Sequence, residues 1–313
     1  MKALNKINVF VADKIHDDGL KLLSKNFKVV TKYGLNNSEL LNFISGYKSS
    51  SKDTLIIHST RKIDGKFIDN LVSTSVKVLC TVSSGFDNID VNACKKNRIK
   101  FFNVPCGNYI SAAEHTFALM LAIAKRLKEE HVGILKGEFE TVSGKTAEIY
   151  KKTIGIIGVG HVGSYVAKLA RCFGMNIIGN DIKKSVINKY RWIKFVPLTK
   201  LLKISNIVSI HTPLDDSTRY LINKKNLKLL NRSSIILNCA RGGVIDEKAL
   251  YNSLKNNKIY YAGIDVFENE PNINFKFAKL SNVLLTPHLA GKTKESYQRM
   301  AIMAAEQIIN YYK

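Results

Sequence analysis

Short apolar runs recur along the chain, and the segments between them carry the spacing of amphipathic helices. The runs are rich in Ile and Val and are too short for helices, which is typical of buried strands in a parallel sheet. We predict strands at residues 7–11, 27–30, 54–58, 76–82, 99–102, 153–157, 175–178, 207–211, 235–238, 262–266 and 283–286.

The intervening segments predict one helix after nearly every strand. The expected helices are residues 17–24, 38–44, 66–71, 91–96, 112–125, 164–172, 184–190, 198–204, 225–230, 246–255 and 294–311. Such β-α alternation is typical of parallel sheets that helices cover on both faces, so we expect an α/β fold. Segment 112–125 has too few polar positions for a helix that faces water, and we expect it to be buried between domains or between subunits.

The length of 313 residues allows two domains, and the apolar fraction of 45% with 23% charged residues is typical of a soluble globular protein. No apolar stretch is long enough for a membrane helix, and the N-terminus does not have the pattern of a signal peptide. The five cysteines are scattered and form no C-x-x-C pair, so we expect reduced thiols and a cytoplasmic setting. No His or Cys pair has a ligand spacing, so no metal site is indicated.

The formal net charge of +23 is unusual for a chain of this composition. The lysines are spread along the whole sequence, which favours a solvated Lys-rich surface. A diffuse positive field that attracts small anions is a second interpretation. Binding to nucleic acid would rest on net charge alone, because no basic run is interleaved with aromatic residues. Loss of binding with modest added salt would be the signature of that third interpretation.

A glycine-rich turn, Gly158-Val159-Gly160-His161-Val162-Gly163, follows the predicted strand at 153–157. Gly158 allows a tight turn from strand to helix, Gly160 lets the backbone approach a pyrophosphate, and Gly163 allows close packing of helix on strand. Asp181 follows the next strand, where its carboxylate can accept hydrogen bonds from ribose hydroxyls. Together these features predict a dinucleotide site. The alternative is a glycine-rich turn in an unrelated α/β domain, with Asp181 there by coincidence.

Three residues that can do chemistry follow three later strands. Arg241 comes after strand 235–238, Glu270 after strand 262–266, and His288 after strand 283–286. Ligands of open parallel sheets bind outside the carboxyl ends of the strands, so the three side chains could converge on one crevice. Taken singly, each would more often be an ordinary loop residue or a surface ion-pair partner.

Several motifs in order make the chain resemble the D-isomer-specific 2-hydroxyacid dehydrogenases. They are GFDNID at 85–90, NVPCGN at 103–108, AAEHTFALMLA at 112–122, GVGHVG at 158–163, HTPL at 211–214, NCARGG at 238–243, GIDVFENEP at 263–271 and TPHLAG at 286–291. The resemblance implies two doubly wound domains. A flavodoxin-like substrate domain would comprise 1–102 and 288–313, and a Rossmann domain for NAD would comprise 103–287.

The family's residue roles carry over by motif position. Arg241, Glu270 and His288 would be the catalytic residues: His288 the acid and base, Glu270 its hydrogen-bond partner, and Arg241 the anchor of the substrate carboxylate. The substrate site would also include the backbone N–H groups of Ser84 and Gly85, and His58. The cofactor site would include Gly158, Gly160, His161, Val162, Gly163, Asp181, His211, Thr212, Pro213, Cys239, Ala240 and Asp265, the last orienting the nicotinamide carboxamide.

The resemblance leaves the substrate open. Family members that act on phosphoglycerate carry arginines at two positions that here read His58 and Thr81, which favours a small 2-oxo acid without a phosphate. Arg61 and Lys62 are near enough in sequence to compensate. The alternative is a short D-3-phosphoglycerate dehydrogenase without a C-terminal regulatory domain.

The resemblance also bears on cofactor choice, assembly and class of protein. Asp181 would repel the 2′-phosphate of NADP, so NAD is the expected cofactor, and the 112–125 region is expected to build a homodimer. A different class with this fold is the NAD(H)-sensing corepressor, which binds the dinucleotide and recruits partners. The end of the sequence at Lys313, without an extension for recruitment, is expected to weigh against that class.

Overall fold

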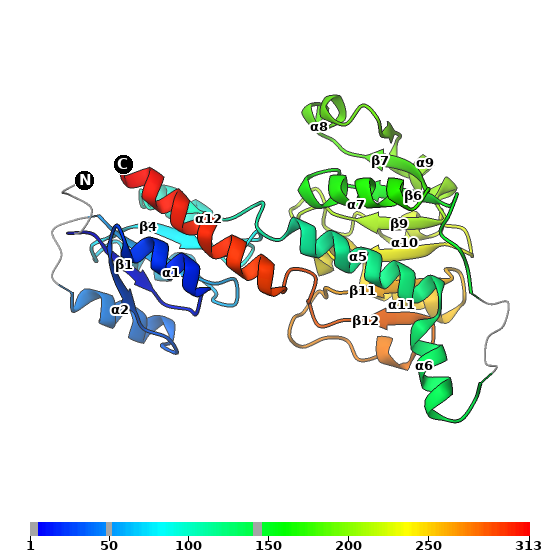
Figure 1. The fold of residues 1–313 in the computed structure, drawn as a ribbon, viewed down its shortest axis with the longest axis horizontal. Coiled ribbons are helices and arrows are strands. Elements are labelled where there is room, and N and C mark those ends of the chain that lie inside the picture. Colours follow the sequence, from blue (N-terminus) through cyan, green and yellow to red (C-terminus); the bar gives the residue numbers. More distant parts are fainter. Residues whose placement is uncertain (1–5, 48–51, 140–145) are drawn as a thin grey trace. The chain divides into compact units, whose positions relative to one another are not determined.

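The computed structural model describes residues 6–47, 52–139 and 146–313. The chain forms two compact units, one made of Met1–Asn108 with Lys292–Lys313 and the other of Tyr109–Gly291. Each unit is a parallel sheet with helices on both faces (Figure 1), which confirms the predicted α/β architecture. Among the described residues, no helix has the length and apolarity needed to cross a membrane.

The first unit contains a five-stranded sheet in the order β2-β1-β3-β4-β5. This is the strand order of flavodoxin-like folds, as expected for this unit. All neighbouring strands pair in parallel. The strands are β1 (Asn8–Val11), β2 (Lys28–Thr31), β3 (Asp53–Ile57), β4 (Val76–Thr81) and β5 (Lys100–Phe102).

Helices cover the first sheet on two sides because its buried strands alternate their side chains. Val9 and Val11 of β1 face a core formed with α1 (Asp17–Ser24) and α12 (Lys294–Tyr312). Phe10 of the same strand faces the opposite core. That second core is built with α2 (Asn37–Ser45), α3 (Gly65–Leu71) and α4 (Val91–Lys96).

The last helix of the chain, α12, completes the first unit. It crosses α1 so closely that a Cβ atom on Gly19 would lie 2.7 Å from the Cβ of Ala301. A glycine opposite an alanine permits this approach of two backbones. The chain therefore returns to its first unit after the whole of the second has been built.

The second unit contains a seven-stranded sheet in the order β12-β11-β10-β9-β6-β7-β8. Counted from β6, this is the Rossmann order 3-2-1-4-5-6 with one further strand at the edge. The strands are β6 (Thr153–Ile157), β7 (Asn176–Asn180), β8 (Lys194–Phe195), β9 (Ile207–Ile210), β10 (Ile235–Asn238), β11 (Tyr261–Ile264) and β12 (Val283–Leu285).

The helices of the second unit also divide between two faces. Ile235 and Leu237 of β10 face one core, which includes α5 and α7, and Ile236 faces the core that includes α9 and α11. The helices are α5 (Tyr109–Ala124), α6 (Leu127–Leu135), α7 (His161–Cys172), α8 (Lys184–Lys189), α9 (Leu198–Ile204), α10 (Lys224–Leu227) and α11 (Glu247–Lys255), with 3-10 turns η2 (Gly242–Val244) and η3 (Phe277–Lys279).

The structure differs from the sequence-based expectations at a few points. The short strand β8 and helix α6 were not expected. The apolar helix α5 packs on α7, β10 and β11 inside the second unit, which accounts for much of its apolar surface. Residues 103–108 group with the first unit and residues 288–291 with the second, so both unit boundaries lie a few residues later than expected. For 288–291 the reason is a set of hydrogen bonds to Asp265, described below.

Candidate active site

The glycine turn at the end of β6 is closed by contacts that only glycine allows. Gly158 has a positive φ of 83°, and a Cβ there would lie 2.8 Å from the carbonyl oxygen of His211. A Cβ on Gly163 would lie 2.1 Å from the carbonyl oxygen of Gly158. Gly160 is different, because a Cβ there would meet no atom within 4 Å. The first and last glycines shape the turn, and the middle one faces open space.

The carboxylate of Asp181 fastens this turn to the end of β7. Its Oδ2 accepts the backbone N–H of Val159 at 2.8 Å, and its Oδ1 accepts that of Lys183 at 2.8 Å. Helix α7 begins beside it at His161, and its N-cap residue, Gly160, supplies no side-chain cap. An uncapped helix N-terminus favours an anion.

Two buried polar atoms beside the turn lack a hydrogen-bond partner among the described residues: Nδ1 of His211 and Oγ1 of Thr212. The other ring nitrogen of His211 is 2.7 Å from Oγ of Ser209, and burial lowers the pKa of His211 to about 3. The ring is therefore neutral at physiological pH. Unsatisfied buried polar atoms call for an explanation, and here they fit a polar ligand above the glycine turn.

Cys239 and Ala240, which follow β10 and were predicted to contact the cofactor, have different hydrogen-bond partners. The thiol of Cys239 is turned toward Thr116 of α5, and burial raises its pKa to about 12, so it is an unreactive thiol. Ala240 donates its backbone N–H to Oδ1 of Asn238 at 3.1 Å.

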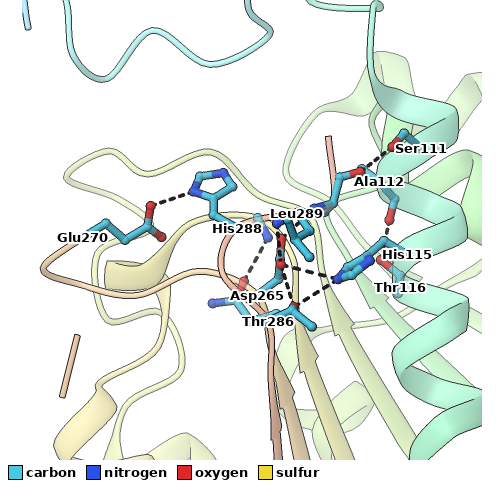
Figure 2. A network of polar contacts seen from close by, with 12 residues as sticks. Ser111, Ala112, His115, Thr116, Asp265, Glu270, Thr286, His288 and Leu289 are labelled. Atoms are coloured by element: carbon cyan, nitrogen blue, oxygen red, sulfur yellow. Dashed lines mark hydrogen bonds and ion pairs between the residues drawn. The ribbon is translucent and has the colours of Figure 1, made fainter. Parts of the chain in front are cut away.

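His288 and Glu270 form a close pair beyond β11 and β12, which are neighbours in the sheet. Nδ1 of His288 is 2.6 Å from Oε2 of Glu270, and the two side chains are 43% and 33% exposed (Figure 2). Burial raises the pKa of Glu270, but hydrogen bonds from His288 and from the backbone N–H of Phe267 outweigh it, so the pKa is lowered. The pair is half accessible, with an ionised carboxylate.

Asp265, at the end of β11, is fully buried and fastens the loop that carries His288. Its Oδ1 accepts the hydroxyl of Thr286 at 2.6 Å and the backbone N–H of Leu289 at 2.7 Å. Its Oδ2 accepts the N–H of Ala290 at 2.9 Å. Burial raises the pKa of Asp265, and the hydrogen bonds that it accepts, the one from His115 first, lower it more, so the pKa lies below its ordinary value.

Arg241 follows β10, the next strand of the same sheet edge. Its Nη1 donates to the carbonyl oxygen of Ala240 at 2.6 Å, and its own carbonyl oxygen accepts from the side chain of Asn238 at 2.9 Å. Glu268, the other acid before Pro271, accepts the backbone N–H of Glu247 at 3.0 Å and so fastens the start of α11. The two acids of this loop thus have different partners.

The predicted substrate residues Ser84, Gly85 and His58 lie in the first unit, in the loops after β4 and β3. Oγ of Ser84 donates to the carbonyl oxygen of Pro105 at 3.1 Å, and the carbonyl oxygen of Gly85 accepts the hydroxyl of Ser83 at 2.7 Å. These bonds fix the backbone of the turn after β4.

One residue of the site was missed by the sequence-based reasoning. His115, on the second turn of α5, has its Nε2 3.0 Å from Oγ1 of Thr286 and 3.4 Å from Oδ1 of Asp265. It is a titratable side chain in a largely apolar helix, which was the signal that could have marked it.

Comparisons with known proteins identify the family to which this chain belongs. Residues 117–290, more than half of the chain, match the family model described as D-isomer specific 2-hydroxyacid dehydrogenase, NAD binding domain. The glyoxylate reductase from Paecilomyes thermophila has a similar solved structure, with a TM-score of 0.86 and 26% identity over 100% of this chain and 96% of that one. The chain belongs to the D-isomer specific 2-hydroxyacid dehydrogenase family, as its motifs predicted.

Two relatives are similar over almost all of this sequence. The hydroxypyruvate reductase of Thermotoga maritima is 36% identical over 307 residues, which cover 97% of each chain. The D-3-phosphoglycerate dehydrogenase of Methanocaldococcus jannaschii is 37% identical over 304 residues, which cover 96% of this chain and 57% of the relative. The chain therefore spans little more than half the length of the second relative.

Proposed function

We propose that the protein is an NAD-dependent oxidoreductase that interconverts a small 2-oxo acid and the corresponding D-2-hydroxy acid. The observation that carries this proposal is the 2.6 Å contact between His288 and Glu270, within a Rossmann unit that matches an NAD-binding domain. A histidine paired with an ionised carboxylate is suited to proton transfer at an oxygen atom.

His288 is the proton donor in the direction of reduction. Its Nδ1 is engaged by Glu270, which leaves Nε2 for the substrate oxygen. NADH, when bound, would supply the hydride for C2 of the 2-oxo acid. Nε2 of the imidazolium would give its proton to the carbonyl oxygen, which becomes the hydroxyl of the product. In the reverse direction the neutral ring accepts the hydroxyl proton.

Glu270 acts on the imidazole ring of His288, and Arg241 acts on the substrate. The carboxylate of Glu270 fixes the orientation of the imidazole ring and stabilises its protonated form. Arg241 would hold the substrate carboxylate with its guanidinium group, which fits a carboxylate in bidentate fashion, and would polarise the neighbouring carbonyl oxygen. The backbone N–H groups of Ser84 and Gly85, in the first unit, are proposed to take part in substrate binding.

The residues around the glycine turn fit NAD. Gly160 leaves space for the pyrophosphate, Asp181 can accept ribose hydroxyls, and the start of α7 favours the phosphate charge. Nδ1 of His211 and Oγ1 of Thr212, which have no partner in the described part of the chain, would bind the polar cofactor beside the turn. We propose backbone contacts from His161, Val162, Pro213, Cys239 and Ala240. The carboxylate of Asp265 already has several partners, so a contact with the nicotinamide carboxamide stays a prediction.

The first unit supports a substrate without a phosphate. Arg61 is engaged by Asp13, with Nη2 to Oδ1 at 2.8 Å, and its Nη1 donates to Asn37 at 3.0 Å; its side chain is only 10% exposed. Burial lowers the pKa of His58, as does nearby Lys292, although Asp13 raises it. Thr81 is buried, with its hydroxyl 2.8 Å from that of Ser83. Since Arg61 is engaged by Asp13, the exposed Lys62 is the one of these two positive side chains that remains for a phosphate.

A D-3-phosphoglycerate dehydrogenase activity is the second candidate, because a relative of that name is 37% identical. Glyoxylate, hydroxypyruvate and pyruvate are the substrates that we favour over 3-phosphohydroxypyruvate. The relatives named for glyoxylate and hydroxypyruvate are covered over nearly their whole length, which agrees with this preference.

We further propose a homodimer in a cytoplasmic setting, with the first unit binding the substrate and the second binding NAD. Helix α6 and the residues after it expose apolar side chains, with Leu127 56%, Leu135 73% and Phe139 88% exposed, and a partner subunit would cover them. Light scattering at low protein concentration measures the assembly, and an active monomer would contradict this part.

The test of the proposed activity is the absorbance of NADH in the presence of a panel of 2-oxo acids. Consumption of NADH with at least one unphosphorylated acid is expected. Binding of NADH without turnover on the whole panel would favour a dinucleotide-sensing protein instead.

A further inference from the structure

Helix α5 contacts the loop that carries His288 through two of its side chains. Nε2 of His115 is 3.0 Å from Oγ1 of Thr286 and 3.4 Å from Oδ1 of Asp265 (Figure 2). One turn earlier, Oγ of Ser111 donates to the carbonyl oxygen of Ala290 at 2.6 Å. The helix therefore meets the loop both before and after His288.

The hydrogen-bond chain fixes the proton on one nitrogen of His115. The hydroxyl of Thr286 has a single proton, which it donates to Oδ1 of Asp265 at 2.6 Å. Its oxygen must then act as the acceptor toward His115, so Nε2 of His115 carries a proton and donates it. His115 thus donates to Thr286 and Thr286 donates to Asp265, and Oδ1 of Asp265 also lies 3.4 Å from Nε2 of His115.

Asp265 in turn binds the backbone around His288 by hydrogen bonds. Its side chain accepts the N–H groups of Leu289 and Ala290, and its carbonyl oxygen accepts the N–H of His288 at 2.8 Å. Three consecutive N–H groups are thus bound to one buried residue.

The loop needs such bonds because His288 has a left-handed backbone, with φ of 53°. A residue other than glycine keeps this conformation only where its surroundings fix it. The direction in which the imidazole points toward Glu270 follows from that backbone. A weakened Asp265 network would therefore misplace the ring without removing any group that reacts.

We infer that His115 is a positioning residue for the reaction, acting on His288 through Thr286 and Asp265. This inference rests on the proposed function. None of the contacts described for His115 reaches His288 or Glu270 directly. His115 would therefore affect the chemical step more than the binding of the pyrophosphate and ribose, because the glycine turn and Asp181 belong to other elements.

The experiment compares His115→Ala with His115→Gln, since the amide nitrogen of glutamine can replace the Nε2 donor. Glu114→Ala is the matched control, because Glu114 is the exposed neighbour on the same helix. We expect His115→Ala to lower kcat about tenfold to a hundredfold and to change the dissociation constant of NADH less than threefold. His115→Gln should recover most of the lost kcat. Glu114→Ala should keep the kcat of the wild type. The alkaline limb of the reduction rate should move to lower pH, as a weaker contact with Glu270 requires.

Thr286→Val provides a second route if His115→Ala does not fold, because it removes the relaying hydroxyl and keeps the shape. A comparable loss of kcat in Thr286→Val supports the inference. Wild-type kcat and an unchanged pH profile in folded His115→Ala or Thr286→Val would overturn it and leave the proposed function standing. If the wild type turns over no 2-oxo acid, the proposed function fails first and this inference fails with it.

Discussion

Gly163 lies against Gly158, so that a Cβ atom on Gly163 would come within 2.1 Å of the carbonyl oxygen of Gly158. That oxygen belongs to the backbone, so it cannot move away as a flexible side chain could. Gly163→Ala should therefore force the first turn of α7 away from β6 and destabilise the protein by about 1–3 kcal/mol, as overpacking usually does. Thermal unfolding measures the loss, and an unchanged Tm would contradict this description of the turn.

Gly160→Ala is the matched comparison, with the opposite expectation. Its φ is −73°, which alanine adopts without strain, and its Cβ would meet no protein atom within 4 Å. The protein should keep its Tm while NADH binding weakens roughly tenfold or more, because the methyl group occupies space that the pyrophosphate needs. Titration of NADH by fluorescence tests this, and equal affinity in wild type and variant would place the pyrophosphate elsewhere.

Glu270→Gln should change the pH dependence of the rate. The pKa of Glu270 is lowered in the folded protein, so its carboxylate is charged near neutral pH. The stabilisation of the fold by this carboxylate is fully present above the ordinary Glu pKa of about 4.3. It is lost only as the pH falls through the lowered pKa of the folded protein. The amide keeps a hydrogen bond to Nδ1 but loses the charge that stabilises the imidazolium. The alkaline limb of the reduction rate should move to lower pH, because the charge that favours the protonated donor is gone. A profile that matches the wild type would show that the contact with Glu270 is only structural.

Asp181 should give a preference for NADH over NADPH. Its carboxylate is fixed by the N–H groups of Val159 and Lys183, so it cannot easily turn away from a 2′-phosphate. The two negative charges repel, and 1.4 kcal/mol of repulsion corresponds to roughly tenfold in kcat/KM. Asp181→Asn keeps one acceptor oxygen and should reduce the difference in kcat/KM between NADH and NADPH. Equal efficiency with both cofactors in the wild type would contradict this role.

The preference for unphosphorylated acids can be measured as kcat/KM for hydroxypyruvate against 3-phosphohydroxypyruvate at one ionic strength. Because Arg61 is occupied by Asp13, we expect hydroxypyruvate to be the better substrate. A hundredfold advantage of the phosphorylated acid, about 2.7 kcal/mol and typical of a good charged contact, would show that another cation binds the phosphate.

Most of the fold could be predicted because each buried strand shows its apolar run in the sequence. Strand β6, helix α1 and helix α9 have the predicted bounds. Strand β8 has two residues, Lys194 and Phe195, which is too short for a pattern. Helix α6 has no side-chain cap at Arg126 and exposes apolar residues, so neither its start nor its periodicity marked it.

The contacts of the candidate site were less predictable than its residues. Motif order singled out Arg241, Glu270 and His288 and predicted the pairing of Glu270 with His288, but the pairing of Glu268 with Glu247 depends on the course of the loop between them. His115 contacts residues about 150–170 positions later in the sequence. Neither relationship has a local signature, because long-range contacts follow from the strand order.

His288→Ala tests most directly whether His288 transfers the proton. Turnover of NADH with the best 2-oxo acid should fall by roughly 10²–10⁴-fold, the usual share of acid–base catalysis, while the dissociation constant of NADH stays near that of the wild type. An equal loss of binding and turnover, or a variant that keeps the wild-type kcat, would contradict the account.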